Sequence, residues 1–116
     1  VNLLEMHGGK AIGLSGMDGK LIEATRKDEK LGYVGEVTKI HLDPVTDILE
    51  KGYIPVVSTL GCDSEGNTYN INGDTAAASI AGAAGTTGCK CQQHDGDQNQ
   101  RDDFFHFCFL LFYLIR

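Results

Sequence analysis

The chain has 116 residues, a hydrophobic fraction of 41% and a formal net charge of −6. This length suffices for one small domain and excludes two, and the hydrophobic fraction excludes general disorder. The acidic charge argues against nucleic acid or an acidic membrane as a partner, because binding to either needs an excess of basic residues.

The first part of the chain consists of short predicted elements separated by glycine-rich turns. Residues 2–7 are expected to be the last turns of a helix that the following pair of glycines ends. An apolar run over 11–14 predicts a buried strand, and residues 20–25 predict a second strand. Because residues 16–19 between them have turn chemistry, we expect the two strands to pair as a hairpin.

A helix between two strands is predicted in the middle of the chain. The run 33–40 has the β-branched and aromatic residues typical of a strand, and 54–58 has the pattern of a buried strand. Between them, Asp43 is the expected N-cap of a helix over 44–51, since Pro44 suits the first helical position. This order predicts a βαβ unit within an α/β sheet.

The composition changes sharply after the last predicted elements, a strand at 68–71 and an Ala-rich helix over 75–84 that Gly85 ends. Residues 1–85 hold every Glu and every Val, whereas residues 86–116 hold all five Phe and three of the four Cys. We therefore divide the chain into a folded body, 1–85, and a tail, 86–116. The tail is expected to be irregular before its Phe-rich end.

The tail contains two features that resemble functional motifs. Cys89, Cys91 and His94 fall short of a zinc pattern, which needs a second pair of ligands, so no metal site is expected. The apolar run 104–115 would extend about 18 Å as a helix, less than the ~30 Å of a bilayer core. We therefore expect an aggregation-prone end rather than a membrane anchor, with a tail-anchored protein as a weaker alternative.

Three polar side chains between a predicted strand and a predicted helix, Asn70, Asn72 and Asp74, give the strongest functional signal. Ligands of α/β sheets bind at strand ends beside helix N-termini, which attract anions. The asparagine amides can donate to a carboxylate, and Asp74 can orient lysines or hold a metal-bound phosphate. The alternative is that Asp74 is only the N-cap and the asparagines serve the turn.

Five segments together carry a resemblance to a known family: Val1-Asn2, Ala11–Gly19, Leu31–Val37, Gly52–Val57 and Tyr69–Thr75. In order and spacing they resemble the N-acetylglutamate kinases of the amino-acid kinase family, above all the plant, algal and cyanobacterial type. The Gly-Tyr-Val-Gly-Glu motif followed by Asn-x-Asn-x-Asp favours this kinase over its aspartate, carbamate and uridylate relatives.

The resemblance implies an α/β/α sandwich, here incomplete, and an enzyme of arginine biosynthesis. Such enzymes transfer the γ-phosphoryl group of ATP, with Mg²⁺, to the side-chain carboxylate of N-acetyl-L-glutamate. By resemblance, Asn70 and Asn72 bind the acetylglutamate, and Asp74 is the catalytic residue that organises two lysines around the transferring group. The family usually has Ala where this chain has Gly73, a small change beside the substrate that should leave these contacts possible.

The resemblance also implies parts that we expect to lie outside the body. The phosphate-binding lysine, the glycine-rich loops and a substrate-binding arginine are expected upstream of Val1, and a second catalytic lysine after Gly85. We therefore expect a fragment that is inactive alone and does not bind ATP tightly, or alternatively a non-catalytic isoform that regulates full-length subunits. The family further implies a homo-oligomer, a nitrogen-regulatory signal protein as partner, and the plastid stroma (in a plant or alga) or the cytoplasm.

Overall fold

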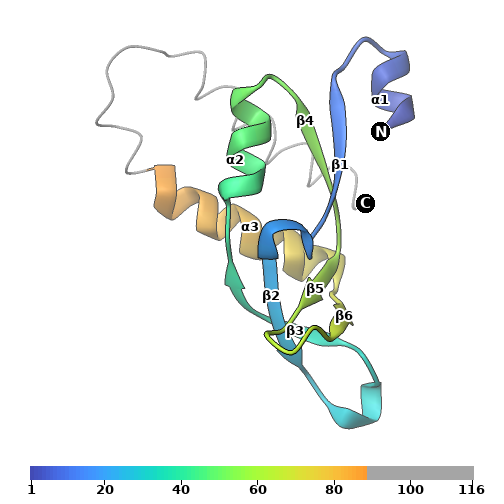
Figure 1. Cartoon of the computed structure of the whole chain (residues 1–116), viewed down its shortest axis with the longest axis vertical. Helices are drawn as coiled ribbons and strands as arrows, with labels where there is room; N and C mark the ends of the chain where they lie inside the picture. The colour runs from blue at the N-terminus through green and yellow to red at the C-terminus, as the bar shows by residue number, and fades with distance from the viewer. Residues whose placement is uncertain (89–116) are drawn as a thin grey trace.

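The computed structural model describes residues 1–88, whose strands form two separate sheets (Figure 1). A two-stranded parallel sheet joins β1 (Ala11–Ser15) to β4 (Ile54–Ser58). A four-stranded mixed sheet has the order β3-β2-β5-β6, with the bounds Gly35–Ile40, Ile22–Arg26, Leu60–Cys62 and Thr68–Asn70. The helices are α1 (Asn2–Met6), α2 (Asp43–Glu50) and α3 (Gly73–Gly88), with 3₁₀ turns at Asp18–Lys20 and Glu29–Leu31. The predicted α/β class is confirmed.

The predicted hairpin between the strands at 11–14 and 20–25 is wrong. β1 pairs in parallel with β4, with Ala11 opposite Ile54, whereas β2 pairs antiparallel with β3. β1 is also less buried than predicted, since Ala11 alone among its residues is fully buried. The turn between the two strands therefore carries the chain out of one sheet and into the other.

Gly16 forms the corner at which the chain changes sheets. Its backbone N–H donates to the Ser58 carbonyl at the end of β4 (3.1 Å), and its own carbonyl accepts from the Ile22 N–H at the start of β2 (2.7 Å). A Cβ at this position would overlap the Leu60 carbonyl oxygen and lie 2.7 Å from Cδ1 of Ile22. Only glycine therefore fits where the two sheets approach so closely.

The predicted βαβ unit is also wrong, because β3 and β4 lie in different sheets. Its helix does form, and it returns the chain to β4 beside β1 (Figure 1). The cap differs from the prediction: Leu42 is the N-cap, without a side-chain hydrogen bond, and Asp43 is the first helical residue. Pro44 nonetheless lies in the first turn, where its missing N–H needs no partner.

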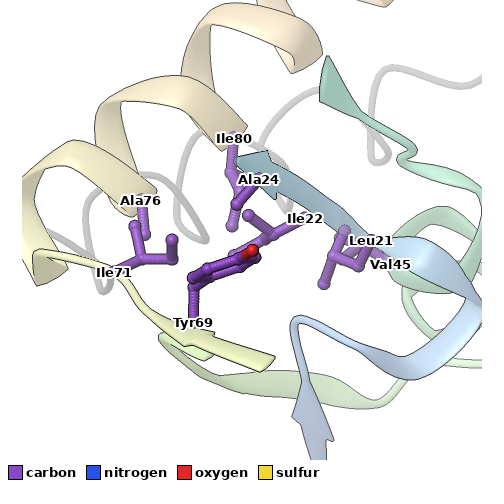
Figure 2. Close-up of a cluster of buried hydrophobic side chains, with 8 residues drawn as sticks. All are labelled: Leu21, Ile22, Ala24, Val45, Tyr69, Ile71, Ala76 and Ile80. Atoms are coloured by element: carbon purple, nitrogen blue, oxygen red, sulfur yellow. The ribbon is translucent and has the colours of Figure 1, made fainter. Parts of the chain in front are cut away.

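The core lies between the four-stranded sheet and the two longer helices (Figure 2). Its side chains come from β2 and the preceding turn, from α2, from β6 and the residue after it, and from α3. They are Leu21, Ile22, Ala24, Val45, Tyr69, Ile71, Ala76 and Ile80. Burial of such apolar surface is the main favourable term in folding, so this cluster fixes α3 against the sheet.

α3 continues through Gly85 to Gly88, so the predicted helix stop at Gly85 and the predicted irregular start of the tail are both wrong. A Cβ added at Gly85 would meet no other part of the described chain within 4 Å beyond its own helix backbone and chain neighbours, and the Gly85 backbone is helical. The remaining predictions for the tail, including Cys89 and the run 104–115, lie outside the described residues. Within residues 1–88, no helix is both long and apolar enough to cross a bilayer.

Candidate functional site

Asn70, Asn72 and Asp74 lie at the junction of β6 and α3, as the sequence predicts. The side chains alternate at this junction. Tyr69 and Ile71 are buried, with exposed fractions of 6% and 2%, whereas Asn70 and Asn72 are exposed. Because neighbouring residues of an extended chain point to opposite sides, the two asparagines lie on the solvent side of the junction.

Asn72, not Asp74, caps α3. The Asn72 side-chain carbonyl accepts hydrogen bonds from the Thr75 backbone N–H (3.1 Å) and hydroxyl (3.3 Å), and its main-chain carbonyl accepts from Ala76 N–H (2.9 Å). The N-cap role suggested for Asp74 is therefore wrong. The alternative that the asparagines serve the turn is correct for the side-chain oxygen of Asn72. Within residues 1–88 its side-chain NH₂ group has no partner and can donate two hydrogen bonds.

Asp74 is an exposed carboxylate in the first turn of α3. Its charge lies where helical N–H groups are unsatisfied, and the helix dipole stabilises an anion there. Within residues 1–88, the side chains of Asn70 and Asp74 make no hydrogen bond. Both polar groups are therefore available to a ligand or to side chains from elsewhere in a larger protein.

The Gly-Tyr-Val-Gly-Glu motif lies beside this junction, although the sequence separates the two. The Asn70 N–H donates to the Tyr33 carbonyl (2.8 Å), and Val34 and Asn70 form a parallel bridge. A Cβ on Gly35 would lie only 2.6 Å from the Tyr69 Cβ. The second glycine of the motif therefore makes room for the residue that precedes Asn70.

Asp63 holds the turn between β5 and β6 with both carboxylate oxygens. Oδ1 accepts from the backbone N–H groups of Glu65 and Asn67 (2.9 Å each). Oδ2 accepts from the Asn67 side-chain amide (2.9 Å) and from the Tyr69 hydroxyl (2.7 Å). These hydrogen bonds, from Asn67 first and then Tyr69, lower the pKa of Asp63 from its ordinary 3.8 to about 2. The sequence indicates only a turn here.

Tyr69 connects this turn to the tip of the β2–β3 hairpin. The rings of Tyr33 and Tyr69 are 6.3 Å apart, and the Arg26 guanidinium lies 4.9 Å from the Tyr33 ring centroid. Arg26 also donates to the Gly32 carbonyl (3.1 Å). The periodicity of the sequence contains no signal for this arrangement of an arginine and two tilted rings.

The arrangement suits an anionic organic ligand better than a metal ion. It offers amide donors and a helix N-terminus, both of which stabilise carboxylates. Within the described part of the chain, His, Cys, Asp and Glu side chains form no group of three that could hold a metal ion. Asp74 alone does not make a Mg²⁺ site, so no chemical step through Mg²⁺ follows from these residues.

A family model and several named relatives both match most of this chain. The family model described as the amino acid kinase family matches residues 1–89. Acetylglutamate kinases from Brachyspira hyodysenteriae, Thermosynechococcus vestitus and Geobacillus thermodenitrificans are 50%, 49% and 51% identical over 80, 86 and 86 residues. These alignments cover 67%, 73% and 73% of this chain but only 28%, 29% and 33% of the relatives.

A solved structure also has a similar fold over most of this chain. The crystal structure of smu.665 from Streptococcus mutans UA159 matches with a TM-score of 0.68 and 32% sequence identity. The match covers 72% of this chain and 35% of that one. The chain thus spans about a third of the length of the proteins it resembles.

Proposed function

The chain belongs to the amino acid kinase family, and from this we propose that it forms the acetylglutamate-binding part of a kinase that phosphorylates N-acetyl-L-glutamate. The reaction would transfer the γ-phosphoryl group of ATP to the side-chain carboxylate. The observation that carries this proposal is the β6–α3 junction, with exposed amides at Asn70 and Asn72 and a carboxylate at Asp74. The name acetylglutamate kinase, which relatives of about 50% identity bear, supports it.

Asn70 and Asn72 would bind the carboxylates and the acetamide of the substrate. The Asn70 side chain has both its donor and its acceptor available within residues 1–88, whereas Asn72 offers only donors, since its oxygen caps α3. Hydrogen bonds from amides to a carboxylate are charge-assisted and about twice as strong as neutral ones. Their placement at a strand end beside a helix N-terminus would orient the substrate relative to that helix.

Asp74 would organise positive charge around the transferring phosphoryl group. Phosphoryl transfer depends on positioning and on neutralisation of negative charge, so the lysines that approach the phosphates must be held in place. The Asp74 carboxylate lies in the first turn of α3, the helix that Asn72 caps. We further propose that the lysines, the ATP site with Mg²⁺, and the contacts that make a homo-oligomer belong to the full-length kinase.

The proposal is tested by a graft. Residues 1–88 replace the matching segment of the full-length Thermosynechococcus vestitus relative, and ADP formation is measured with N-acetylglutamate, glutamate and aspartate as acceptors. We expect activity with N-acetylglutamate and at most a trace with the other two. A folded graft that is inactive, or that prefers another acceptor, would overturn the proposal.

The alternative of a non-catalytic isoform is decided by a parallel measurement. The 116-residue chain is added in increasing amounts to the unmodified full-length relative at a fixed concentration of substrate. A saturable change in rate, without catalysis by the chain alone, would support the regulatory alternative. An unchanged rate together with an active graft would support the kinase proposal.

A further inference from the structure

We propose that Asp63 and Tyr69 are positioning residues for Asn70, and that together they set the affinity of the site for N-acetylglutamate. The inference rests on the proposed function, because it takes Asn70 to be a substrate ligand. Neither side chain would touch the substrate. Both would act by fixing the strand from which the Asn70 amide projects.

The strand itself offers few contacts that hold the Asn70 side chain in place. β6 has three residues, Thr68–Asn70, and pairs with β5 along one side, whereas on its other side Asn70 alone forms a bridge, to Val34. Asn70 is its last residue, and the Asn70 side chain makes no hydrogen bond within residues 1–88. The direction of that side chain therefore depends on what anchors the preceding residue, Tyr69.

Tyr69 is anchored from the side of the β5–β6 turn by Asp63. The Tyr69 hydroxyl donates to Oδ2 of Asp63 (2.7 Å), and the Tyr69 ring is part of the buried core (Figure 2). Asp63 is itself fixed, because its carboxylate accepts three further hydrogen bonds from Glu65 and Asn67. An ionised acceptor with all its partners in place makes a stronger and better-oriented bond than a neutral one.

Tyr69 is also confined from the side of the β2–β3 hairpin. Gly35 leaves just enough room for the Tyr69 Cβ, and the Tyr33 ring lies beside the Tyr69 ring. The Tyr33 carbonyl accepts the Asn70 N–H. The backbone of Asn70 is thus held directly, while its orientation about the strand axis depends on the Tyr69 ring and its hydroxyl. Loss of the hydroxyl leaves the ring buried but free to shift towards the turn.

The test uses Tyr69→Phe in the active graft, since this change removes one oxygen atom and keeps the ring. We expect the KM for N-acetylglutamate to rise roughly 3- to 10-fold. This is less than the roughly 10- to 150-fold for loss of a direct hydrogen bond to a charged ligand, because Tyr69 would act only through Asn70. The kcat and the KM for ATP should change less than about twofold. Asp63→Asn should give the same pattern. Tyr53→Phe is the matched control, because Tyr53 lies outside this network, and it should leave KM unchanged.

A double-mutant cycle separates this inference from the proposed function. If Tyr69 acts through Asn70, Tyr69→Phe should raise KM in the parent graft but add almost nothing in an Asn70→Ala background. Additive effects, or a lower melting temperature with an unchanged KM, would overturn the inference and leave Tyr69 a structural residue. An unchanged KM in Asn70→Ala alone would instead overturn the assignment of Asn70 in the proposed function.

Discussion

The Asn70 backbone amide donates a 2.8 Å hydrogen bond to the Tyr33 carbonyl, and this bond joins the end of β6 to the residues just before β3, the opposite edge strand of the four-stranded sheet. The sheet therefore curls around Tyr69 and Ile71 rather than remaining open at that end. The hairpin that carries Tyr33 and the junction that carries Asn70 are consequently coupled. A structural change in either segment should therefore alter the geometry of the candidate site.

Asn70→Ala should weaken substrate binding in the graft. The Asn70 amide is exposed and lacks a side-chain partner within the described residues. Its removal should therefore take away a hydrogen bond to the substrate while hardly changing the stability of the fold. Loss of a bond to a charged group costs about 1.5–3 kcal/mol, so KM for N-acetylglutamate should rise roughly 10- to 150-fold. Asn2→Ala in α1 is the control. An unchanged KM would mean that Asn70 serves only the turn.

Asp74→Asn should lower kcat far more than it raises KM for N-acetylglutamate. A group that acts on the charge of the transition state affects turnover rather than ground-state binding. Asp43→Asn is a closely matched control, because Asp43 is also an exposed acidic residue in the first turn of a helix. Steady-state kinetics of both variants decide the point. Near-normal turnover in Asp74→Asn would contradict its assigned role.

Asn72→Asp should separate the capping role of this residue from its binding role. Aspartate and asparagine are about equally good N-caps, so the oxygen that accepts from Thr75 is retained and thermal stability should hardly change. The substitution replaces amide donors with a second negative charge, so KM for N-acetylglutamate should rise. Asn72→Ala should in addition lower stability by about 0.5–2 kcal/mol. Equal KM values for Asn72→Asp and the parent would exclude substrate contact.

Acid stability of the chain should depend in part on Asp63. Its pKa is about 2 in the folded state against an ordinary 3.8, so its ionised form stabilises the fold above pH 3.8. That contribution is lost as the pH falls from 3.8 towards 2. Denaturant unfolding at a series of pH values should therefore show that the free energy of unfolding falls less steeply at acid pH in Asp63→Asn than in the parent chain.

Asp63→Asn should still lose part of its stability at acid pH because of Glu23. The Glu23 carboxylate lies 2.5 Å from Nε2 of His41, and this hydrogen bond lowers the pKa of Glu23. Its ionised form therefore also stabilises the fold, and this contribution is lost as the pH falls below the ordinary 4.5 and through the lowered pKa of Glu23. An equal loss of stability at acid pH in Asp63→Asn and the parent would show that the hydrogen bonds to Asp63 do not persist in solution.

Gly35→Ala should destabilise the chain by about 1–3 kcal/mol, the usual cost of overpacking. The new Cβ would lie 2.6 Å from the Tyr69 Cβ and 2.8 Å from Cδ1 of Ile71. Gly82→Ala is the control, since nothing lies within 4 Å of a Cβ there and alanine favours the helix. The urea concentration at the midpoint of unfolding should fall for Gly35→Ala and rise for Gly82→Ala. Equal midpoints would show that the sheet does not close around Tyr69.

The sequence predicts the position of the candidate site well because the signals there are local. A strand residue at Asn70, a polar pair and an Ala-rich helix appear in the structure at the expected positions. The alternative that makes Asp74 the N-cap is wrong, and the sequence does not show this because Asn72 and Asp74 are two residues apart and both residue types cap helices well. Residue preference alone does not separate them.

The pairing of strands and the Asp63–Tyr69 contact lie beyond what the sequence predicts. Turn residues at 16–19 predict that the chain turns, but they do not identify the partner of β1, which is β4. The hydrogen bond between Asp63 and Tyr69 depends on the antiparallel pairing of β5 and β6. Such contacts between elements follow from the fold, and no pattern of spacing indicates them.

The parallel pairing of β1 with β4 has a consequence for the order of folding. The segment between Ala11 and Ile54 contains the corner at Gly16, the β2–β3 hairpin and α2, so the pairing of these two residues closes a long loop. Local antiparallel pairs form faster than such distant parallel ones. We expect the β2–β3 hairpin to acquire amide protection first during refolding, and the two strands of the smaller sheet to acquire it last.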